Sequence, residues 1–170
     1  MSFLQVLRIK KTEQMTTESY IPDEKDRSIL RLLQKDSKLS VREIAAKINL
    51  SPTPTHERIK RMEKLGIIKE YVTIIDRKKI NKGIMVICMI ALNAHNKKTA
   101  TEFIEEVVKL KEVIEFYNIS GEFDFMLKIL APNMDDFHDF FINKLSEIEG
   151  IGQTKSIFVM NSIKETTQIL

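Results

Sequence analysis

One stretch of the chain, residues 49–66, carries marks at both of its ends that fix the position of a short helix. Ser51 is typical of the residue before a helix, because a serine hydroxyl can accept from the free amide groups of the first turn. Pro52 falls at the first helical position, where a missing N–H costs nothing, and Pro54 still lies within the first turn. Gly66 suits the left-handed position that ends a helix. The pattern predicts a helix between Ser51 and Gly66.

The predicted helix is amphipathic. Ile59, Met62 and Leu65 form one apolar stripe. A helix that is buried on one side and basic on the other can offer charge to phosphates and polar side chains to base edges. A solvated basic surface helix is the alternative that the pattern leaves open. The side chains that point away from the stripe or flank it are Thr53, His56, Glu57, Lys60, Lys64, Arg58 and Arg61.

Two more helices are predicted before this one. Asp23 can cap a helix that runs to about Lys35, and Ser40 with Glu43 forms a capping box that opens a second helix. Asn49 ends that second helix, and only about three residues separate it from the third. Such a tight connection between short amphipathic helices is the helix-turn-helix arrangement, whose second helix lies in the DNA major groove.

Charge is distributed unevenly along the 170 residues. The net charge is +3, but residues 35–82 carry 13 Lys and Arg against 6 Asp and Glu, whereas residues 83–170 carry 8 against 13. The first of these parts is therefore suited to a polyanion and the second is not. No apolar run is long enough to span a membrane, and the first nine residues lack the features of a secretory signal. The single Cys88 excludes an intrachain disulfide, and we expect a cytoplasmic protein.

The chain changes its period after the third helix. Residues 67–75 are rich in β-forming side chains and predict a strand, either a wing or a link, and the polar residues 76–83 contain the predicted domain boundary. The later elements follow the order β-α-β-β-α-β, that of the ferredoxin-like fold, with its helices on one face of an antiparallel sheet. The first strand is too apolar for water, so we expect a second copy of the domain to cover the other face. The predicted elements are strand 84–92, helix 97–110, strand 113–119, turn 120–122, strand 123–130, helix 134–148, turn 150–152 and strand 155–163.

The predicted fold class is therefore α+β, with a winged-helix-like helix-turn-helix domain followed by a ferredoxin-like βαββαβ domain. The first residues have no clear period and are interpreted as a tail, flexible or paired with a partner chain, and Met15 is an alternative start. The expected divisions are a tail 1–21, a helix-turn-helix domain 22–68, a strand and linker 69–83, and an effector-binding and oligomerisation domain 84–166.

Three segments together resemble the leucine-responsive/asparagine regulator (Lrp/AsnC) family of prokaryotic transcription factors. They are Asp26-Arg27-Ser28-Ile29-Leu30, Asn49-Leu50-Ser51-Pro52-Thr53-Pro54 followed by Glu57-Arg58-Ile59, and residues 113–127 with Ser120-Gly121-Glu122-Phe123-Asp124. The resemblance covers about residues 22–166. It implies a DNA-binding helix-turn-helix, dimers that assemble further, often into octamers, and an amino-acid effector held between dimers.

The resemblance also implies roles for individual residues. Ser40 and Arg42, at the start of the second helix, suit phosphate contacts. The residues expected to bind DNA on the third helix or at its start are Ser51, Thr53, Thr55, His56, Arg58, Lys60 and Arg61. The residues expected to bind the effector are Ser120, Gly121, Glu122 and Asp124, with Gln153 and Thr154 placed where a neighbouring dimer could close the pocket.

The chemistry of the hairpin agrees with this reading. An amino acid needs amide donors for its carboxylate and an acid for its ammonium group, and Gly121 exposes amides while Asp124 can accept from the ammonium. The alternative is that Ser120-Gly121-Glu122 is only a hairpin turn and Asp124 only an acid at its end.

No catalytic or metal site is expected, because the sequence has no Gly-rich phosphate loop and no His/Cys pair at metal-ligand spacing. We therefore expect no cofactor beyond an amino-acid effector. The predicted function is a sequence-specific DNA-binding transcriptional regulator that responds to an amino acid. A sensing module that acts through protein partners without DNA is the alternative, and an enzyme would need a catalytic group that the sequence lacks.

Overall fold

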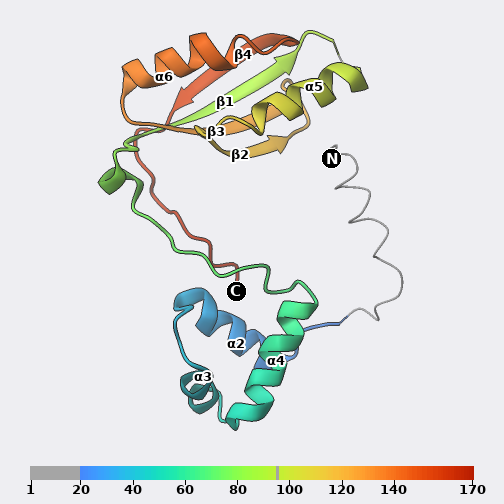
Figure 1. Cartoon of the computed structure of the whole chain (residues 1–170), viewed down its shortest axis with the longest axis vertical. Helices are drawn as coiled ribbons and strands as arrows, with labels where there is room; N and C mark the ends of the chain where they lie inside the picture. Colours follow the sequence, from blue (N-terminus) through green and yellow to red (C-terminus); the bar gives the residue numbers. More distant parts are fainter. Residues whose placement is uncertain (1–19, 95) are drawn as a thin grey trace. The chain divides into compact units, whose positions relative to one another are not determined.

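The computed structural model describes residues 20–94 and 96–170, so the predicted tail 1–21 falls almost wholly outside the described residues. These residues form two compact units (Figure 1). The first unit contains residues 20–74 together with Lys164–Leu170, and the second contains Ile75–Ile163. By this division the polar linker 76–83 lies in the second unit.

The first unit is a three-helix arrangement of α2 (Glu24–Lys35), α3 (Val41–Lys47) and α4 (Pro52–Lys64). The predicted capping boxes are both present, with Asp23 paired to Asp26 before α2 and Ser40 paired to Glu43 before α3. Apolar side chains from all three helices form the core of this unit. Its buried members are Ile29, Ile44, Ile48, Ile59 and Met62. The predicted helix-turn-helix is confirmed.

The start of α4 differs from the prediction in one respect. Ser51 is the residue before the helix and has an extended backbone, but its side chain makes no capping hydrogen bond. A capping hydroxyl accepts from the second or third residue of the helix, and the third residue here is Pro54, which has no N–H. The backbone carbonyl of Ser51 instead accepts from the Thr55 hydroxyl at 2.9 Å.

The predicted strand 67–75 is wrong for the described chain, because the whole segment lacks strand structure. A strand requires a neighbour for its backbone hydrogen bonds, and none is paired with it here. Val72 and Ile74 are 60% and 72% exposed. One side chain is anchored, since the Tyr71 hydroxyl donates to Glu63 Oε1 on α4 at 3.0 Å.

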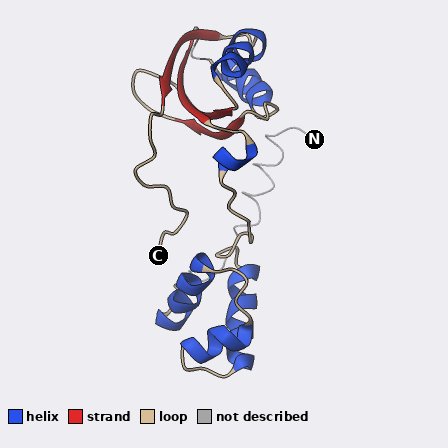
Figure 2. Cartoon of the chain, turned by 90° about the vertical axis from the view of Figure 1, so that its left-hand side faces the viewer, coloured by secondary structure: helices blue, strands red, loops and turns tan. Residues whose placement is uncertain are grey.

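The second unit has the predicted ferredoxin-like topology. Its four strands form one antiparallel sheet in the order β2-β3-β1-β4, and its helices cover one face of that sheet (Figure 2). The elements are η1 (Arg77–Ile80), β1 (Ile84–Leu92), α5 (Lys97–Val107), β2 (Val113–Asn118), β3 (Phe125–Ala131), α6 (Met134–Phe140), η2 (Phe141–Leu145) and β4 (Ile151–Phe158).

Alternation along the strands separates a packed face from an open one. The side chains of Val86, Cys88 and Ile90 on β1 and of Leu127 and Ile129 on β3 belong to the core under the helices. The residues between them face the other way and are only half buried or exposed. On that open face the strand register groups Ile87, Met89, Met126, Leu130 and Ile157.

The last strand spans Ile151–Phe158, so it begins four residues earlier and ends five residues earlier than the predicted strand 155–163. The predicted turn 150–152 is therefore wrong beyond Gly150, because Ile151 and Gly152 already lie in β4. A Cβ on Gly152 would come within 2.9 Å of the Asn93 backbone nitrogen, so this glycine allows β4 to lie against the end of β1. Gly150 provides the turn itself, with a φ of 94°.

The chain ends against the first unit. Gln34 on α2 donates to the Thr167 carbonyl at 3.4 Å, and its side-chain oxygen accepts from the Leu170 amide at 3.2 Å. Within the described residues no helix is both long and apolar enough to cross a membrane.

Candidate nucleic-acid interface and effector site

The outward face of α4 carries three of the side chains predicted to contact DNA. Thr53, His56 and Lys60 are exposed, and the Lys60 ammonium donates to Glu63 Oε2 at 2.8 Å. Their spacing of three and four residues places them along one line of the helix surface. Glu57 lies on the same exposed face, and its carboxylate would repel a nearby phosphate. The face therefore combines polar groups of the kind that contact base edges with an exposed acid that restricts how closely the DNA backbone can approach.

The N-termini of α3 and α4 present different chemistry. The Ser40 hydroxyl is occupied by Glu43, to which it donates at 2.7 Å, and the hydrogen bond from Ser40 is the main cause that lowers the pKa of Glu43. Arg42 is exposed on α3. Ser51 is exposed and has no capping bond, so its hydroxyl is available to a phosphate oxygen at the start of α4.

Thr55 does not belong to this surface, and its prediction as a DNA contact is corrected. Its side chain is fully buried, and its hydroxyl donates to the Ser51 carbonyl one turn back along α4. Position 55 falls on the same side of the helix as the core residues Ile59 and Met62, four and seven residues further on. A threonine at this position stabilises the first turn rather than reading a base.

Arg58 also faces inward. Its Nη1 lies 2.6 Å from Oδ2 of Asp23 and 2.8 Å from Oδ1 of Asp26, and the Asp26 side chain is only 1% exposed. Hydrogen bonds from the Asp26 amide and then from Arg58 lower the pKa of Asp23 to about 2. The guanidinium thus joins α4 to the start of α2, and its geometry is that of a residue that positions the recognition helix.

Arg61 extends the same cluster to Tyr20, which sequence reasoning missed. Arg61 Nη2 donates to the Tyr20 hydroxyl at 2.7 Å, and the guanidinium lies 4.5 Å from the centre of the tyrosine ring. The Tyr20 hydroxyl donates in turn to Asp26 Oδ2. Burial first, and then the hydrogen bond to Asp26, raise the pKa of Tyr20. Arg61 is still 48% exposed, so part of its charge faces solvent.

The predicted effector hairpin lies beside the end of β1. Ser120, Gly121 and Glu122 are exposed, and Gly121 has a φ of 124° that favours glycine. Asp124 Oδ2 accepts from the Leu92 backbone amide at 2.8 Å, and the Asp124 amide donates to the Ile90 carbonyl. The carboxylate therefore fixes the hairpin to β1 at the position where the β1–β4 register shifts.

Gln153 and Thr154 reach the same end of the sheet from its other side. In β4 they pair with Ala91 and Ile90, while Ile90 pairs with Phe125 of β3 on its opposite edge. Two strand spacings, about 10 Å, therefore separate the two sets of predicted residues. Alternation puts Gln153 on the open face of the sheet and Thr154 toward the helices. The structure brings the two sets to one end of the sheet without joining them in a single cavity of this chain.

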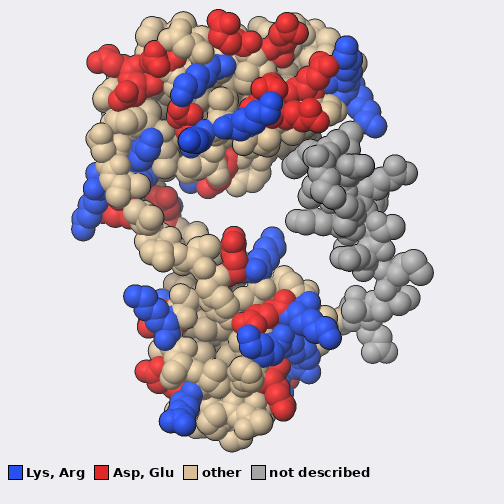
Figure 3. All heavy atoms as spheres, viewed as in Figure 1, with Lys and Arg blue, Asp and Glu red and all other residues tan. Residues whose placement is uncertain are grey.

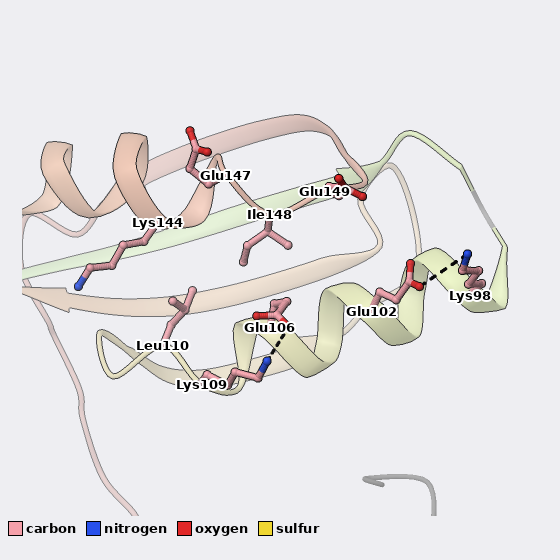
Figure 4. Close-up of a pocket in the computed structure, with 9 residues that line it drawn as sticks. All are labelled: Lys98, Glu102, Glu106, Lys109, Leu110, Lys144, Glu147, Ile148 and Glu149. Carbon is pink, nitrogen blue, oxygen red and sulfur yellow. Dashed lines mark hydrogen bonds and ion pairs between the residues drawn. The ribbon is translucent and has the colours of Figure 1, made fainter.

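A groove in the second unit lies elsewhere, between α5 and the end of η2 (Figure 4). It has a volume of about 550 Å³ and an apolar floor of Leu110 and Ile148. Lys98 pairs with Glu102 and Lys109 pairs with Glu106 along its wall. Acidic side chains also spread over the helices in the surface view (Figure 3). None of the predicted effector residues lines this groove. Among residues 20–94 and 96–170, no group of three His, Cys, Asp or Glu side chains could hold a metal ion.

Comparison with protein families assigns both units. Residues 22–69 match the winged helix-turn-helix DNA-binding model, and residues 85–169 match the Lrp/AsnC ligand binding domain. The two matches follow the same order as the two units and include the helix-turn-helix and all of the sheet except Ile84.

Individual relatives agree over nearly their whole length. Transcriptional regulator AzlB of Bacillus subtilis is 35% identical over 147 residues, which are 86% of this chain and 94% of that protein. The crystal structure of an AsnC family transcriptional regulator from Agrobacterium tumefaciens superposes with a TM-score of 0.83 at 37% identity, covering 87% of this chain and 96% of that one. A transcriptional regulator from Neisseria meningitidis, crystallised as its L-Met complex, gives 0.82 at 29% identity, covering 85% and 94%. The chain therefore belongs to the Lrp/AsnC family of DNA-binding transcriptional regulators.

Proposed function

We propose that this regulator changes its binding to DNA when a free amino acid binds at the hairpin end of the sheet. The observation that carries the proposal is the position of Asp124, a carboxylate held beside an exposed glycine turn at the end of β1. The Lrp/AsnC ligand binding domain covers this region, and the Neisseria meningitidis relative was crystallised with L-Met. Exposed amides and a fixed carboxylate are the two features that an amino-acid zwitterion requires.

The bond from Asp124 to Leu92 is compatible with this role. A carboxylate offers about four acceptor positions, so Asp124 can accept from the Leu92 amide and from a ligand ammonium group together. The bond to the backbone also fixes the side chain in one orientation, which lowers the entropy cost of binding. Gly121 and Glu122 would supply amides for the ligand carboxylate, and Ser120 a hydroxyl.

The proposed active form is an assembly rather than a single chain. The open face of the sheet exposes apolar side chains from three strands, and a second copy packed against it would bury them. Gln153 lies on this open face, so a residue predicted to close the effector site lies at the proposed interface. A dimer that assembles further, up to an octamer, would join pockets from neighbouring dimers, and the ligand would act by favouring one assembly over another.

Thermal shift across the twenty amino acids tests the proposal directly. A ligand at 100 times its Kd raises the stability of the folded state by about 2.7 kcal/mol. The Asp124→Asn variant keeps an oxygen that can accept from Leu92 but loses the negative charge, so it should fold and lose the shift. Glu147→Gln, which removes one exposed charge from the groove beside α5, is the matched control. A variant Asp124→Asn that keeps the full shift would overturn the assigned site.

A second measurement asks whether that ligand changes the affinity for DNA or the size of the assembly. Wild-type protein should bind random-sequence duplex with an affinity that falls steeply with salt. The amino acid that gives the thermal shift should change that affinity or the size of the assembly measured by light scattering. Unchanged affinity and unchanged size in the presence of a bound amino acid would refute the regulatory role of the ligand.

A further inference from the structure

The second unit begins with a basic turn that the helix-turn-helix does not include. It comprises Asp76–Gly83, with the short helix η1 at its centre and the adjacent Lys78 and Lys79 side chains exposed. The side-chain ammonium groups of these two lysines make no hydrogen bond or ion pair with any described residue. They are a pair of solvated positive charges on an ordered stretch of backbone.

Internal bonds hold the turn in one conformation. Asp76 accepts from the Lys78 amide at 3.0 Å, and Arg77 Nη1 donates to the carbonyls of Lys82 at 3.2 Å and Gly83 at 2.8 Å. Asn81 takes the left-handed conformation, with a φ of 57°, and closes the turn. Arg77 thus acts within the turn, whereas Lys78 and Lys79 point their charge outward. A preformed backbone lowers the entropy cost of using those charges in binding.

The turn is a positive region on an otherwise acidic unit. Residues 76–83 carry 4 Lys and Arg against 1 Asp, while residues 84–163 carry 7 against 12 Asp and Glu. Figure 3 shows basic side chains at the edge of the second unit, where Figure 1 places the η1 turn. Lys82 interacts with Glu112 and is therefore not counted as a free charge. The remaining pair has the charge that phosphate oxygens attract, whereas the acidic helices of the same unit would repel them.

The chain length keeps the turn within reach of DNA that is bound by α4. The segment between Leu65, at the end of α4, and Arg77 can span at most about 40 Å when fully extended. One turn of B-DNA is about 34 Å long. Phosphates within about one duplex turn of the recognition site are thus accessible to Lys78 and Lys79.

We propose that Lys78 and Lys79 form a second, sequence-independent contact with the DNA backbone, outside the segment read by α4. The inference rests on DNA binding by the helix-turn-helix and adds a contact from the second unit. Two phosphates neutralised by lysine contribute about 2 to the slope of log affinity against log salt. The contact lengthens the footprint without changing which bases are read.

Duplex length and salt together test the inference. The Lys78→Ala/Lys79→Ala double variant of the full-length protein is compared with wild type on random-sequence duplexes of about 8 base pairs, shorter than one turn, and about 45 base pairs. On the longer duplex the variant should bind more weakly than wild type, and its slope of log affinity against log salt should be smaller by about 2. The ratio of wild-type to variant affinity should therefore fall about tenfold between about 50 and 200 mM salt. On the shorter duplex the two proteins should bind alike.

A charge-matched control separates position from net charge. Lys97→Ala/Lys98→Ala removes two exposed lysines from the start of α5 in the same unit and should leave both slopes unchanged. Equal salt slopes for Lys78→Ala/Lys79→Ala and wild type on the longer duplex would overturn the inference while leaving DNA binding by the helix-turn-helix intact. An equal loss on both duplex lengths, or an equal loss in the control, would also overturn it. Failure of the wild-type protein to bind either duplex would instead refute DNA binding itself.

Discussion

Arg58 Nη1 on the recognition helix lies 2.8 Å from Oδ1 of Asp26, a carboxylate that is buried at the start of α2. A buried carboxylate is costly unless it is paired and hydrogen bonded. The Asp26 carboxylate has four partners. Besides the ion pair with Arg58, it accepts hydrogen bonds from the Asp23 amide and the Tyr20 hydroxyl, and it lies 3.7 Å from the Arg61 guanidinium. The basic side of α4 therefore serves two purposes: some of its cations face solvent and others fix the helix to its neighbour.

Arg58→Ala is expected to destabilise the first unit. Removal of the guanidinium leaves the Asp26 carboxylate buried with one strong partner fewer, and the loss should be about 3 kcal/mol, at the low end for buried pairs because Arg58 is 27% exposed. Thermal unfolding of the full-length protein, followed by the helical signal, measures this loss.

The double variant Arg58→Ala/Asp26→Asn provides the control for that prediction. It removes the uncompensated charge together with its partner, so it should be more stable than Arg58→Ala alone. At a temperature where the Arg58→Ala variant is still folded, the slope of log DNA affinity against log salt for this single variant should equal that of wild type. A slope reduced by about 1 would show that Arg58 contacts a phosphate after all.

Two serines that look alike in sequence should behave differently when replaced by alanine. Ser40 has its full capping box with Glu43, so Ser40→Ala should lower the free energy of unfolding by about 1 kcal/mol. Ser51 makes no side-chain capping bond, so Ser51→Ala should leave stability unchanged within about 0.5 kcal/mol and weaken DNA binding instead. Urea unfolding and duplex titration on the same two variants decide the matter. Equal destabilisation by both would contradict the role assigned to Pro54.

The sequence was sufficient for the positions of helices and for the topology of the sheet, because those follow from periodicity and local turn chemistry. Its errors came where distant residues decide the outcome. The ion pairs of Arg58 were missed, since nothing local to α4 shows that Asp23 and Asp26 lie beside it. An Asp-x-x-Asp at the start of one helix together with two arginines on another is a signal that could have suggested the pairing.

The second unit shows the same distinction. The strand β1 was predicted at its observed bounds, because its nine residues form a continuous apolar run with polar residues on both sides. The start of β4 was missed, because Ile151 and Gly152 read locally as part of a turn. Their strand conformation depends on pairing with the end of β1, where Gly152 lies against the Asn93 backbone. The segment 67–75 has β-forming residues but no neighbour in this chain to pair with, and composition cannot supply one.

Base readout by the exposed face of α4 is predicted to depend on His56. The His56→Ala variant removes a side chain that is exposed and contributes nothing to the core, so the melting temperature should not change. A lost base contact costs about 1–3 kcal/mol, so affinity for specific operator DNA should fall about 5- to 150-fold, with random-sequence binding largely kept. Thr55→Val is the contrasting variant, since the buried hydroxyl should affect stability and not discrimination between bases. Equal operator affinity for His56→Ala and wild type would remove His56 from the reading face.

Tyr71 should make the stability of the first unit fall at high pH. Burial first, and then the hydrogen bond to Glu63, raise the pKa of Tyr71 to about 12 from its ordinary value of 10.0. A group whose pKa is higher in the folded state stabilises that state fully below the unfolded pKa and loses its contribution as pH rises through the folded value. The loss should therefore fall between about pH 10 and 12, and solvent screening should keep it to about 1 kcal/mol because the side chain is 48% exposed. Tyr71→Phe should be less stable than wild type near neutral pH and should show a smaller decline across this window in urea unfolding. Parallel curves for the two proteins would show that the hydroxyl does not hold the linker to Glu63.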